Sequence, residues 1–260
     1  MRITLFTSNK NRHNFFINLL SEVSRELFVV QECGTILSVP SNYQASPLMK
    51  KYFENVMHAQ SQLFGNSYIN NKNKNIKILP MLLGDLNQYP IRLLSDFLKS
   101  DAYVVFGSSY IKGELASFLI KQKAINIHAG VSPYYRGSAC NFWALYDDNP
   151  HLVGTTIHLL SKGLDSGPML YHAMSNLKTN PFEYTMSTVK AAFVSVVTRI
   201  KDGSILKIKP LLQKKNSEIR SSKKKQFNEK IVMEFFNMKI DLNSKKFDNS
   251  LLKDPYFLEK

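Results

Sequence analysis

Short apolar runs alternate with amphipathic segments along the first half of the chain, and this alternation restricts the fold more than any other feature. Apolar runs lie at residues 2–6, 27–30, 76–79, 101–106 and 124–128. Residues 12–24, between the first two runs, carry apolar side chains at helical spacing. The run DAYVVF at residues 101–106 is apolar enough to be buried on both faces, as strands of parallel sheets are. The pattern predicts an α/β fold, a Rossmann-like, mostly parallel doubly wound sheet.

Local signals place further elements. Ser46 followed by Pro47 is typical of a helix start, and Gly65 of a helix end. Further helices are expected at residues 90–99, 138–146, 181–200 and 229–236, and further strands at residues 151–160, 168–174 and 205–210. We expect a catalytic domain over residues 1–205 and a small basic C-terminal extension over residues 206–260.

Polar residues whose side chains could take part in catalysis lie in the middle of the chain. Asn126 and His128 are two positions apart in an expected strand, so their side chains face the same side. Asp165 follows 37 positions after His128, between Gly163 and Gly167. Alone, a histidine in a strand is usually a satisfied core residue and such a glycine loop is usually a turn. Together, an amide, an imidazole and a carboxylate at strand ends and tight loops are the groups that acyl chemistry uses.

This stretch resembles the signature of the folate-dependent formyltransferases. That pattern is Asn-x-His, a turn ending in Arg-Gly, and an Asp in a Gly-x-Asp-x-Gly loop. The matching residues are Asn126, His128, Pro133, Arg136, Gly137, Gly163, Asp165 and Gly167. One departure is the sequence AGVS at residues 129–132, where the family usually has Pro-Ser-Leu-Leu, which leaves the shape of this loop open.

The resemblance implies roles for these residues. Asn126 and His128 would stabilise the oxyanion that forms when an amine attacks a formyl carbon, and Asp165 would orient and protonate His128. The formyl donor would be 10-formyltetrahydrofolate, with no metal. The implied donor-binding residues are Gly107, Ser109, Tyr110, Ile111, Lys112, Gly163, Leu164 and Asp165.

Candidate acceptor-binding residues lie in two turns. Asn9 and Arg12 belong to the turn after the first strand, whose N–H groups are suited to a phosphate, although an ordinary capped turn explains them equally well. Tyr135 and Arg136 lie in the second turn. For Arg136 we weigh phosphate binding against a structural ion pair, and slightly favour the structural role.

The family contains several acceptor classes, and elimination favours one. The methionyl-tRNA enzymes carry a longer C-terminal barrel, and the glycinamide ribonucleotide enzymes usually have a glycine-rich turn where this chain reads SNKNR. A nucleotide-linked amino-deoxysugar remains as the expected small-molecule acceptor. Both other enzymes stay as alternatives, and so does a folate- or nucleotide-binding regulator without activity.

Charge and composition restrict partners further. The net charge is +14, and residues 199–260 hold 16 Lys and Arg against 8 Asp and Glu. Lys223, Lys224 and Lys225 most often indicate a solvated loop, then attraction of an anionic substrate, then RNA. Nucleic-acid binding is disfavoured but stays open, and so does a homodimer.

Two distant cysteines indicate reduced thiols, and no apolar run approaches the ~20 residues of a membrane span, so we expect a cytoplasmic protein without membrane attachment.

Overall fold

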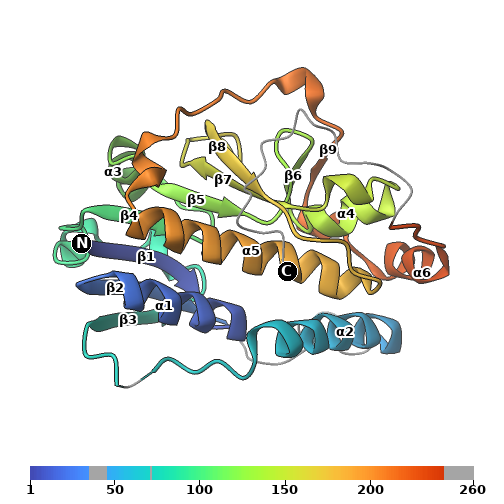
Figure 1. Ribbon diagram of the computed structural model, residues 1–260, viewed down its shortest axis with the longest axis horizontal. Coiled ribbons are helices and arrows are strands. Elements are labelled where there is room, and N and C mark those ends of the chain that lie inside the picture. The colour runs from blue at the N-terminus through green and yellow to red at the C-terminus, as the bar shows by residue number, and fades with distance from the viewer. Residues whose placement is uncertain (35–45, 71, 243–260) are drawn as a thin grey trace.

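The computed structural model describes residues 1–34, 46–70 and 72–242, and a seven-stranded sheet runs through its centre (Figure 1). Its strands are β1 (Arg2–Ser8), β2 (Glu26–Cys33), β3 (Ile76–Leu82), β4 (Ala102–Val105), β5 (Ile125–His128), β7 (Thr155–Leu159) and β8 (Met169–Ala173). The α-helices are α1 (Asn11–Val23), α2 (Pro47–Phe64), α3 (Gly113–Lys121), α4 (Cys140–Tyr146), α5 (Pro181–Lys201) and α6 (Glu229–Asn237). A second, two-stranded sheet pairs β6 (Tyr135–Gly137) with β9 (Arg220–Ser222).

The strand order of the large sheet creates a binding crevice. The order is β3-β2-β1-β4-β5-β7-β8, with β1 to β5 parallel and with β7 and β8 antiparallel to their neighbours. The chain builds outward from β1 in one direction through β2 and β3, and in the other through β4 and β5. Ligands of open α/β sheets bind beyond the carboxyl ends of the strands at such a reversal. The predicted Rossmann-like, mostly parallel sheet is confirmed.

Side-chain alternation along the strands builds a core on each face of the sheet. Leu5 of β1 packs with α1 and α5, whereas Phe6 packs with α3 on the opposite face. On the first face, Phe16 stacks on Phe193 with ring centroids 4.4 Å apart. These two helix layers bury both faces of the parallel strands, which explains why residues 101–106 are almost continuously apolar.

A third cluster lies beside the sheet and ties in the C-terminal segment. Its aromatic side chains come from α2, α4, the start of α5, α6 and the turn before α6: Tyr52, Phe142, Phe182, Phe227 and Phe235. Arg220 of β9 donates two hydrogen bonds to the Asp147 carboxylate, at 2.6 and 2.8 Å, and its guanidinium lies 4.4 Å from the centroid of the Trp143 ring. Residues 220–237 therefore pack against the rest of the fold, and the division at residue 205 stays a prediction.

Local capping signals are confirmed. Ser46 accepts a hydrogen bond from the Met49 N–H at 3.2 Å, and the Gly65 N–H donates to the Ser61 carbonyl at 3.0 Å. Gly65 has a φ of 62°, a value that glycine adopts without strain. Both ends of α2 therefore lie where the sequence places them.

The expected helix over residues 90–99 is wrong. Only Ile91–Leu94 form a short 3₁₀ turn. The carbonyls of Phe97 and Leu98 accept hydrogen bonds from the side chains of Thr4 and Tyr103, so sheet residues take over acceptors that a longer helix would use internally.

The expected strand over residues 205–210 is also wrong, because Ser204–Lys207 form a 3₁₀ turn. The Asp202 carboxylate accepts from the Ser204 N–H at 2.8 Å and starts this turn. The strand expected over residues 151–160 is shorter, since Pro150–Leu152 form a separate turn before β7. Helix α3 and the β6–β9 pair are absent from the sequence prediction. No helix in the described part of the chain is long and apolar enough to cross a membrane.

Candidate active site

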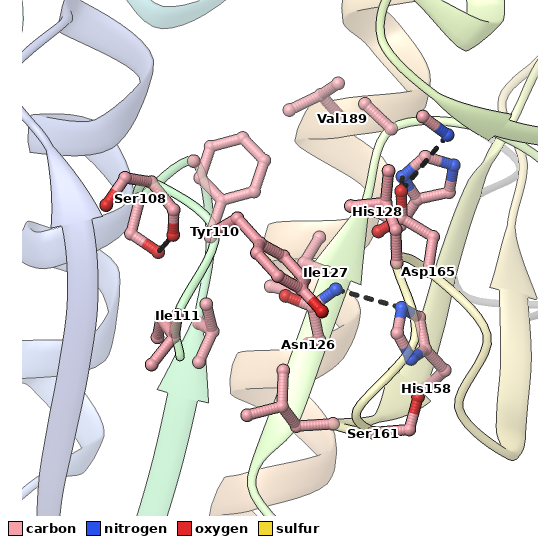
Figure 2. Close-up of a pocket in the computed structure, with 18 of the residues that line it drawn as sticks. Ser108, Tyr110, Ile111, Asn126, Ile127, His128, His158, Ser161, Asp165 and Val189 are labelled. Atoms are coloured by element: carbon pink, nitrogen blue, oxygen red, sulfur yellow. Dashed lines mark hydrogen bonds and ion pairs between the residues drawn. The ribbon is translucent and has the colours of Figure 1, made fainter. Parts of the chain in front are cut away.

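A cavity of about 370 Å³ lies beyond the carboxyl ends of β4 and β5. Its wall includes Asn126 and His128 from β5, the loop after β4, and the loop between β7 and β8. Figure 2 shows Asn126 and His128 as neighbours along β5, with Asp165 beside His128 and His158 beside Asn126. The polar residues that the sequence singles out therefore meet at the crevice expected for this topology.

His128 and Asp165 form a buried pair. The His128 Nδ1 atom lies 3.3 Å from the Asp165 Oδ2 atom, and the two side chains are 6% and 11% exposed. The His128 Nε2 atom lies 3.2 Å from the Tyr135 carbonyl oxygen. Both ring nitrogens thus face oxygen acceptors, an arrangement that the doubly protonated imidazolium satisfies in full. The pair can hold a proton at the edge of the cavity.

The backbone holds Asp165 in an uncommon conformation. Its φ is 47°, and its carboxylate accepts a hydrogen bond from the Gly137 N–H at 3.2 Å. The Gln213 side-chain amide donates to the carbonyls of Asp165 and Gly167, both at 2.8 Å. A Cβ at Gly167 would lie 1.7 Å from the Leu159 carbonyl oxygen, so only glycine allows this approach. The close packing fixes the carboxylate against His128.

His158 orients Asn126, a contact that the sequence pattern does not indicate. Asn126 and His158 are paired residues of β5 and β7, and the Asn126 Nδ2 and His158 Nε2 atoms lie 2.9 Å apart. The His158 Nδ1 atom donates to the Leu159 carbonyl at 2.8 Å, which leaves Nε2 as the acceptor for the Asn126 amide. Burial lowers the pKa of His158 to about 4, so its ring stays neutral near pH 7. One Asn126 N–H is used in this contact. The other makes no hydrogen bond to residues that the structure describes, so it is available to an oxygen in the cavity.

Two loops close the cavity over its far side. Gly107, Ser109, Tyr110 and Ile111 come from one loop, and Gly163 and Leu164 join Asp165 in the other. The Tyr110 hydroxyl donates to the Lys162 carbonyl and links the two loops. Seven of the eight expected donor-binding residues line this cavity. Lys112 does not line it, and its N–H donates to the Asn87 side chain at 2.7 Å.

A second cavity, of about 390 Å³, meets the first at His128. Arg12, Ala129, Gly137, Met186 and Val189 also line both cavities. The imidazole therefore stands at the boundary of two spaces, each of the size of a small ligand or part of one.

The central part of this chain matches a known protein family. The family model described as formyl transferase matches residues 100–200. Over this stretch the chain is similar to the formyl transferase family. The match contains β5, the Asp165 loop and most of α5, so this formyl transferase region holds Asn126, His128, His158 and Asp165 together.

Related sequences and structures extend the comparison. The methionyl-tRNA formyltransferase of Thermosynechococcus vestitus is 38% identical over 73 residues, which is 28% of this chain and 22% of that protein. This chain thus matches only about a fifth of that relative's length. The crystal structure of a sugar N-formyltransferase from Shewanella sp. FDAARGOS_354 has a TM-score of 0.54 at 14% identity, covering 87% of this chain and 78% of that one. Glycinamide ribonucleotide transformylase 1 from Symbiobacterium toebii has a TM-score of 0.52 at 15% identity, covering 82% and 94%. These structural likenesses concern the fold.

Three of the four residues expected to bind the acceptor lie outside both cavities of the formyl transferase region. Asn9 exchanges hydrogen bonds with the backbone of Gly34. Tyr135 is buried and its hydroxyl accepts from the Asn149 side chain at 2.9 Å. Arg136 lies 3.2 Å from Glu218 and donates to Gln213, which is the structural role weighed for it. Arg12 alone lines both cavities.

A buried carboxylate organises the loop that follows β4. Glu32 at the end of β2 is 0% exposed and accepts from the Ser109 N–H at 2.5 Å, the Ser109 hydroxyl at 2.8 Å and the Gly84 N–H at 2.9 Å. Hydrogen bonds to charged groups contribute roughly 1.5–3 kcal/mol each, so these contacts hold the Ser109 backbone against the sheet.

We expect Glu32→Gln to weaken binding of 5-formyltetrahydrofolate about tenfold or more, because the new amide turns a donor toward N–H groups that need an acceptor. Isothermal titration calorimetry measures this directly. The control is Glu26→Gln, since Glu26 lies on the same strand but pairs at the surface with Arg2 and Lys77. Equal donor affinity in the two variants would contradict a role for Glu32 in positioning the loop.

Acidification should destabilise the fold through His158. The folded-state pKa of His158 is about 4, below its ordinary value of 6.5. Between about pH 6.5 and pH 4, His158 is therefore protonated in the unfolded chain but not in the folded chain. The free energy of unfolding decreases over this range as the pH falls, by up to about 3 kcal/mol. Burial also lowers the pKa of His13 and adds to the same trend. Urea unfolding at pH 7.5 and 5.0 should show a smaller pH difference for His158→Gln than for the wild type; an unchanged difference would remove His158 as a cause.

Proposed function

We propose that this protein transfers the formyl group of 10-formyltetrahydrofolate to the amine of a small acceptor, a nucleotide-linked amino-deoxysugar. The observation that carries this is the position of His128, paired with Asp165 and shared by two cavities. A transfer reaction needs two ligands to meet at one proton-handling group, and this arrangement provides it.

The residues of the first cavity suit the formyl donor. Strand-end and loop backbone from residues 105–111 and 163–165 presents N–H and C=O groups, while Ile111 and Leu160 supply apolar surface. A flat pterin ring has donors and acceptors along its edge and apolar faces, so it matches such a slot. The donor's formyl group would then lie toward Asn126 and His128.

Asn126, His128 and Asp165 would have different roles in the reaction. The second Asn126 N–H and the His128 ring would stabilise the oxyanion that forms as the amine attacks the formyl carbon. For this His128 gives up its long bond to the Tyr135 carbonyl, since catalytic hydrogen bonds are often loose before substrates bind. Asp165 would keep His128 oriented and protonated and relay the amine's proton through water. The bond between the formyl carbon and N10 of the donor then breaks, N10 takes up a proton, and tetrahydrofolate leaves. No step uses a covalent enzyme intermediate.

The proposal of a sugar nucleotide rests on the second cavity. It is bounded by aromatic side chains with cations at Arg12 and Lys224, which suits a compact anionic acceptor better than a large polyanion. The similarity to methionyl-tRNA formyltransferases over 73 residues keeps methionyl-tRNA as the second candidate.

A single assay separates these functions. Purified protein is incubated with 10-formyltetrahydrofolate and, separately, with dTDP-, UDP- and GDP-linked amino-deoxysugars, glycinamide ribonucleotide and methionyl-tRNA. Mass spectrometry should detect one added formyl group on a sugar nucleotide. Formylation of methionyl-tRNA or glycinamide ribonucleotide alone would replace the acceptor, and the absence of any product despite donor binding would favour a folate-binding regulator.

A further inference from the structure

Gln213 lies in the C-terminal segment, outside the stretch that matches the formyl transferase family, and it contacts the loop that contains Asp165. The NH2 group of its side chain donates one hydrogen bond to the Asp165 carbonyl and one to the Gly167 carbonyl, both at 2.8 Å. Two carbonyl oxygens that point toward the same place repel each other unless a donor lies between them. The conformation of this loop therefore depends on a residue 48 positions further along the chain than Asp165.

Arg136 fixes the orientation of the Gln213 amide. The Nε and Nη2 atoms of Arg136 donate to the Gln213 Oε1 atom at 3.1 and 2.7 Å. Arginine has only donors, so the amide oxygen must face Arg136 and the amide nitrogen must face the loop carbonyls. The amide then accepts two hydrogen bonds and donates two, which satisfies its full capacity and holds the side chain in one position.

The backbone on both sides of Gln213 is anchored as well. Leu211 and Met169 of β8 exchange two backbone hydrogen bonds, at 2.7 and 2.8 Å. Beyond Gln213, the Glu218 carboxylate lies 3.2 Å from the Nη1 atom of Arg136. These contacts hold the segment against the edge of the sheet, so the Gln213 side chain is in place before any ligand binds.

The conformation of Asp165 requires such support. Its φ of 47° lies in the left-handed region, which residues other than glycine rarely adopt and which persists only where surrounding contacts hold it. The Gly137 N–H holds the carboxylate, and Gln213 holds the carbonyl. A rotation of the backbone at this carbonyl would also turn the side chain, and the carboxylate would leave its position 3.3 Å from His128.

From these contacts we infer that Gln213 is a positioning residue of the transfer reaction. It acts through the backbone of Asp165, and Arg136 acts through Gln213. Gln213 lines neither cavity, so it exerts this effect without touching the donor or the acceptor. The inference rests on the proposed function, and it makes the C-terminal segment necessary for the alignment of Asp165 with His128.

Two substitutions remove the donated hydrogen bonds in different ways. Gln213→Glu keeps the length of the side chain and the contact with Arg136 but turns an oxygen toward the two carbonyls. Gln213→Met loses both contacts and adds no charge. We expect both variants to lower kcat about tenfold or more at saturating donor and acceptor, with KM values changed less than about threefold, because the ligand contacts remain.

The matched control is Gln122→Glu, which should leave kcat unchanged. Gln122 is exposed at the end of α3, three residues before β5 begins, and so lies at the edge of the sheet opposite to the site. Wild-type kcat in both Gln213 variants would overturn the inference. A loss in Gln213→Glu without one in Gln213→Met would also overturn it, since the added charge and not the lost bonds would then be the cause.

A double-mutant cycle shows whether Gln213 acts through Asp165. In the Asp165→Ala background, Gln213→Met should lower kcat by less than about twofold, because the carboxylate that it positions is already absent. A contribution to overall stability alone would lower kcat by the same factor in both backgrounds, and that additive result would overturn the inference.

Hydrogen exchange tests the loop without an acceptor. The amides of residues 163–167 should exchange about tenfold faster in Gln213→Met than in the wild type or in Gln122→Glu. Strands β1 and β4 should keep their wild-type exchange, which shows that the fold is intact. Unchanged exchange of residues 163–167 would overturn the inference.

The outcomes separate this inference from the function itself. If the wild type transfers a formyl group and the Gln213 variants keep its kcat, the inference is overturned and the function stands. If no acceptor is formylated while exchange of residues 163–167 increases as expected, the function is overturned and the support of the Asp165 loop by Gln213 stands.

Discussion

The variant His128→Ala is expected to lower the kcat of formyl transfer by about 100-fold or more. The imidazole is the group that both cavities share, and its removal takes away the proton at the point where the acceptor meets the formyl carbon. The variant should still bind 5-formyltetrahydrofolate, because most of the donor cavity is formed by other residues. Single-turnover kinetics with saturating donor and acceptor measure the chemical step directly.

Asp165 should act in the same unit as His128. We expect Asp165→Ala to cause a loss of similar size, and the double variant His128→Ala/Asp165→Ala to lose little more than either single variant. Residues that act through one proton relay are non-additive in this way. Additive losses in this double-mutant cycle, or near wild-type turnover of His128→Ala, would show that the pair at 3.3 Å has no joint catalytic role.

The second large effect is expected at Asn126. Asn126→Ala should reduce kcat by roughly 10²–10³ with little change in KM, since a preorganised amide donor acts on the oxyanion more strongly than on the ground-state formyl group. His158→Ala should have a smaller effect in the same direction, because it removes the acceptor that holds the Asn126 amide at 2.9 Å.

The conservative variant His158→Gln distinguishes positioning from packing. A glutamine carbonyl can accept from the Asn126 amide but does not replace the imidazole ring in the packing. The kcat of His158→Gln should therefore lie closer to the wild-type value than that of His158→Ala. If His158→Gln and His158→Ala have equal kcat, the contact with Asn126 does not matter for turnover. An Asn126→Ala variant that changes KM alone would instead make Asn126 a ground-state binding residue.

Local chemistry explains which elements the sequence predicts well. The apolar strands β1 to β5, the cap at Ser46 and the helix end at Gly65 are indicated by patterns within a few residues, and they lie where expected. Residues 90–99 differ, because the side chains that bond the Phe97 and Leu98 carbonyls belong to two strands of the sheet. Thr4 lies 93 positions away on β1, and Tyr103 lies on β4, the next strand in the chain. A pattern of apolar spacing contains no information about such competing donors.

The candidate site was also predictable only in part from the sequence. The parallel sheet and the spacing of Asn126, His128 and Asp165 could be predicted from the sequence alone, since strand periodicity and glycine-flanked turns are local properties. The tertiary structure places His158 opposite Asn126, because this contact depends on the antiparallel register of β5 and β7. It alone also brought Lys224 and Phe227 to the second cavity, through the pairing of β6 with β9. Both arrangements arise from hydrogen bonds between segments far apart in the chain, and register at that distance follows from the packing of the whole fold rather than from any single stretch.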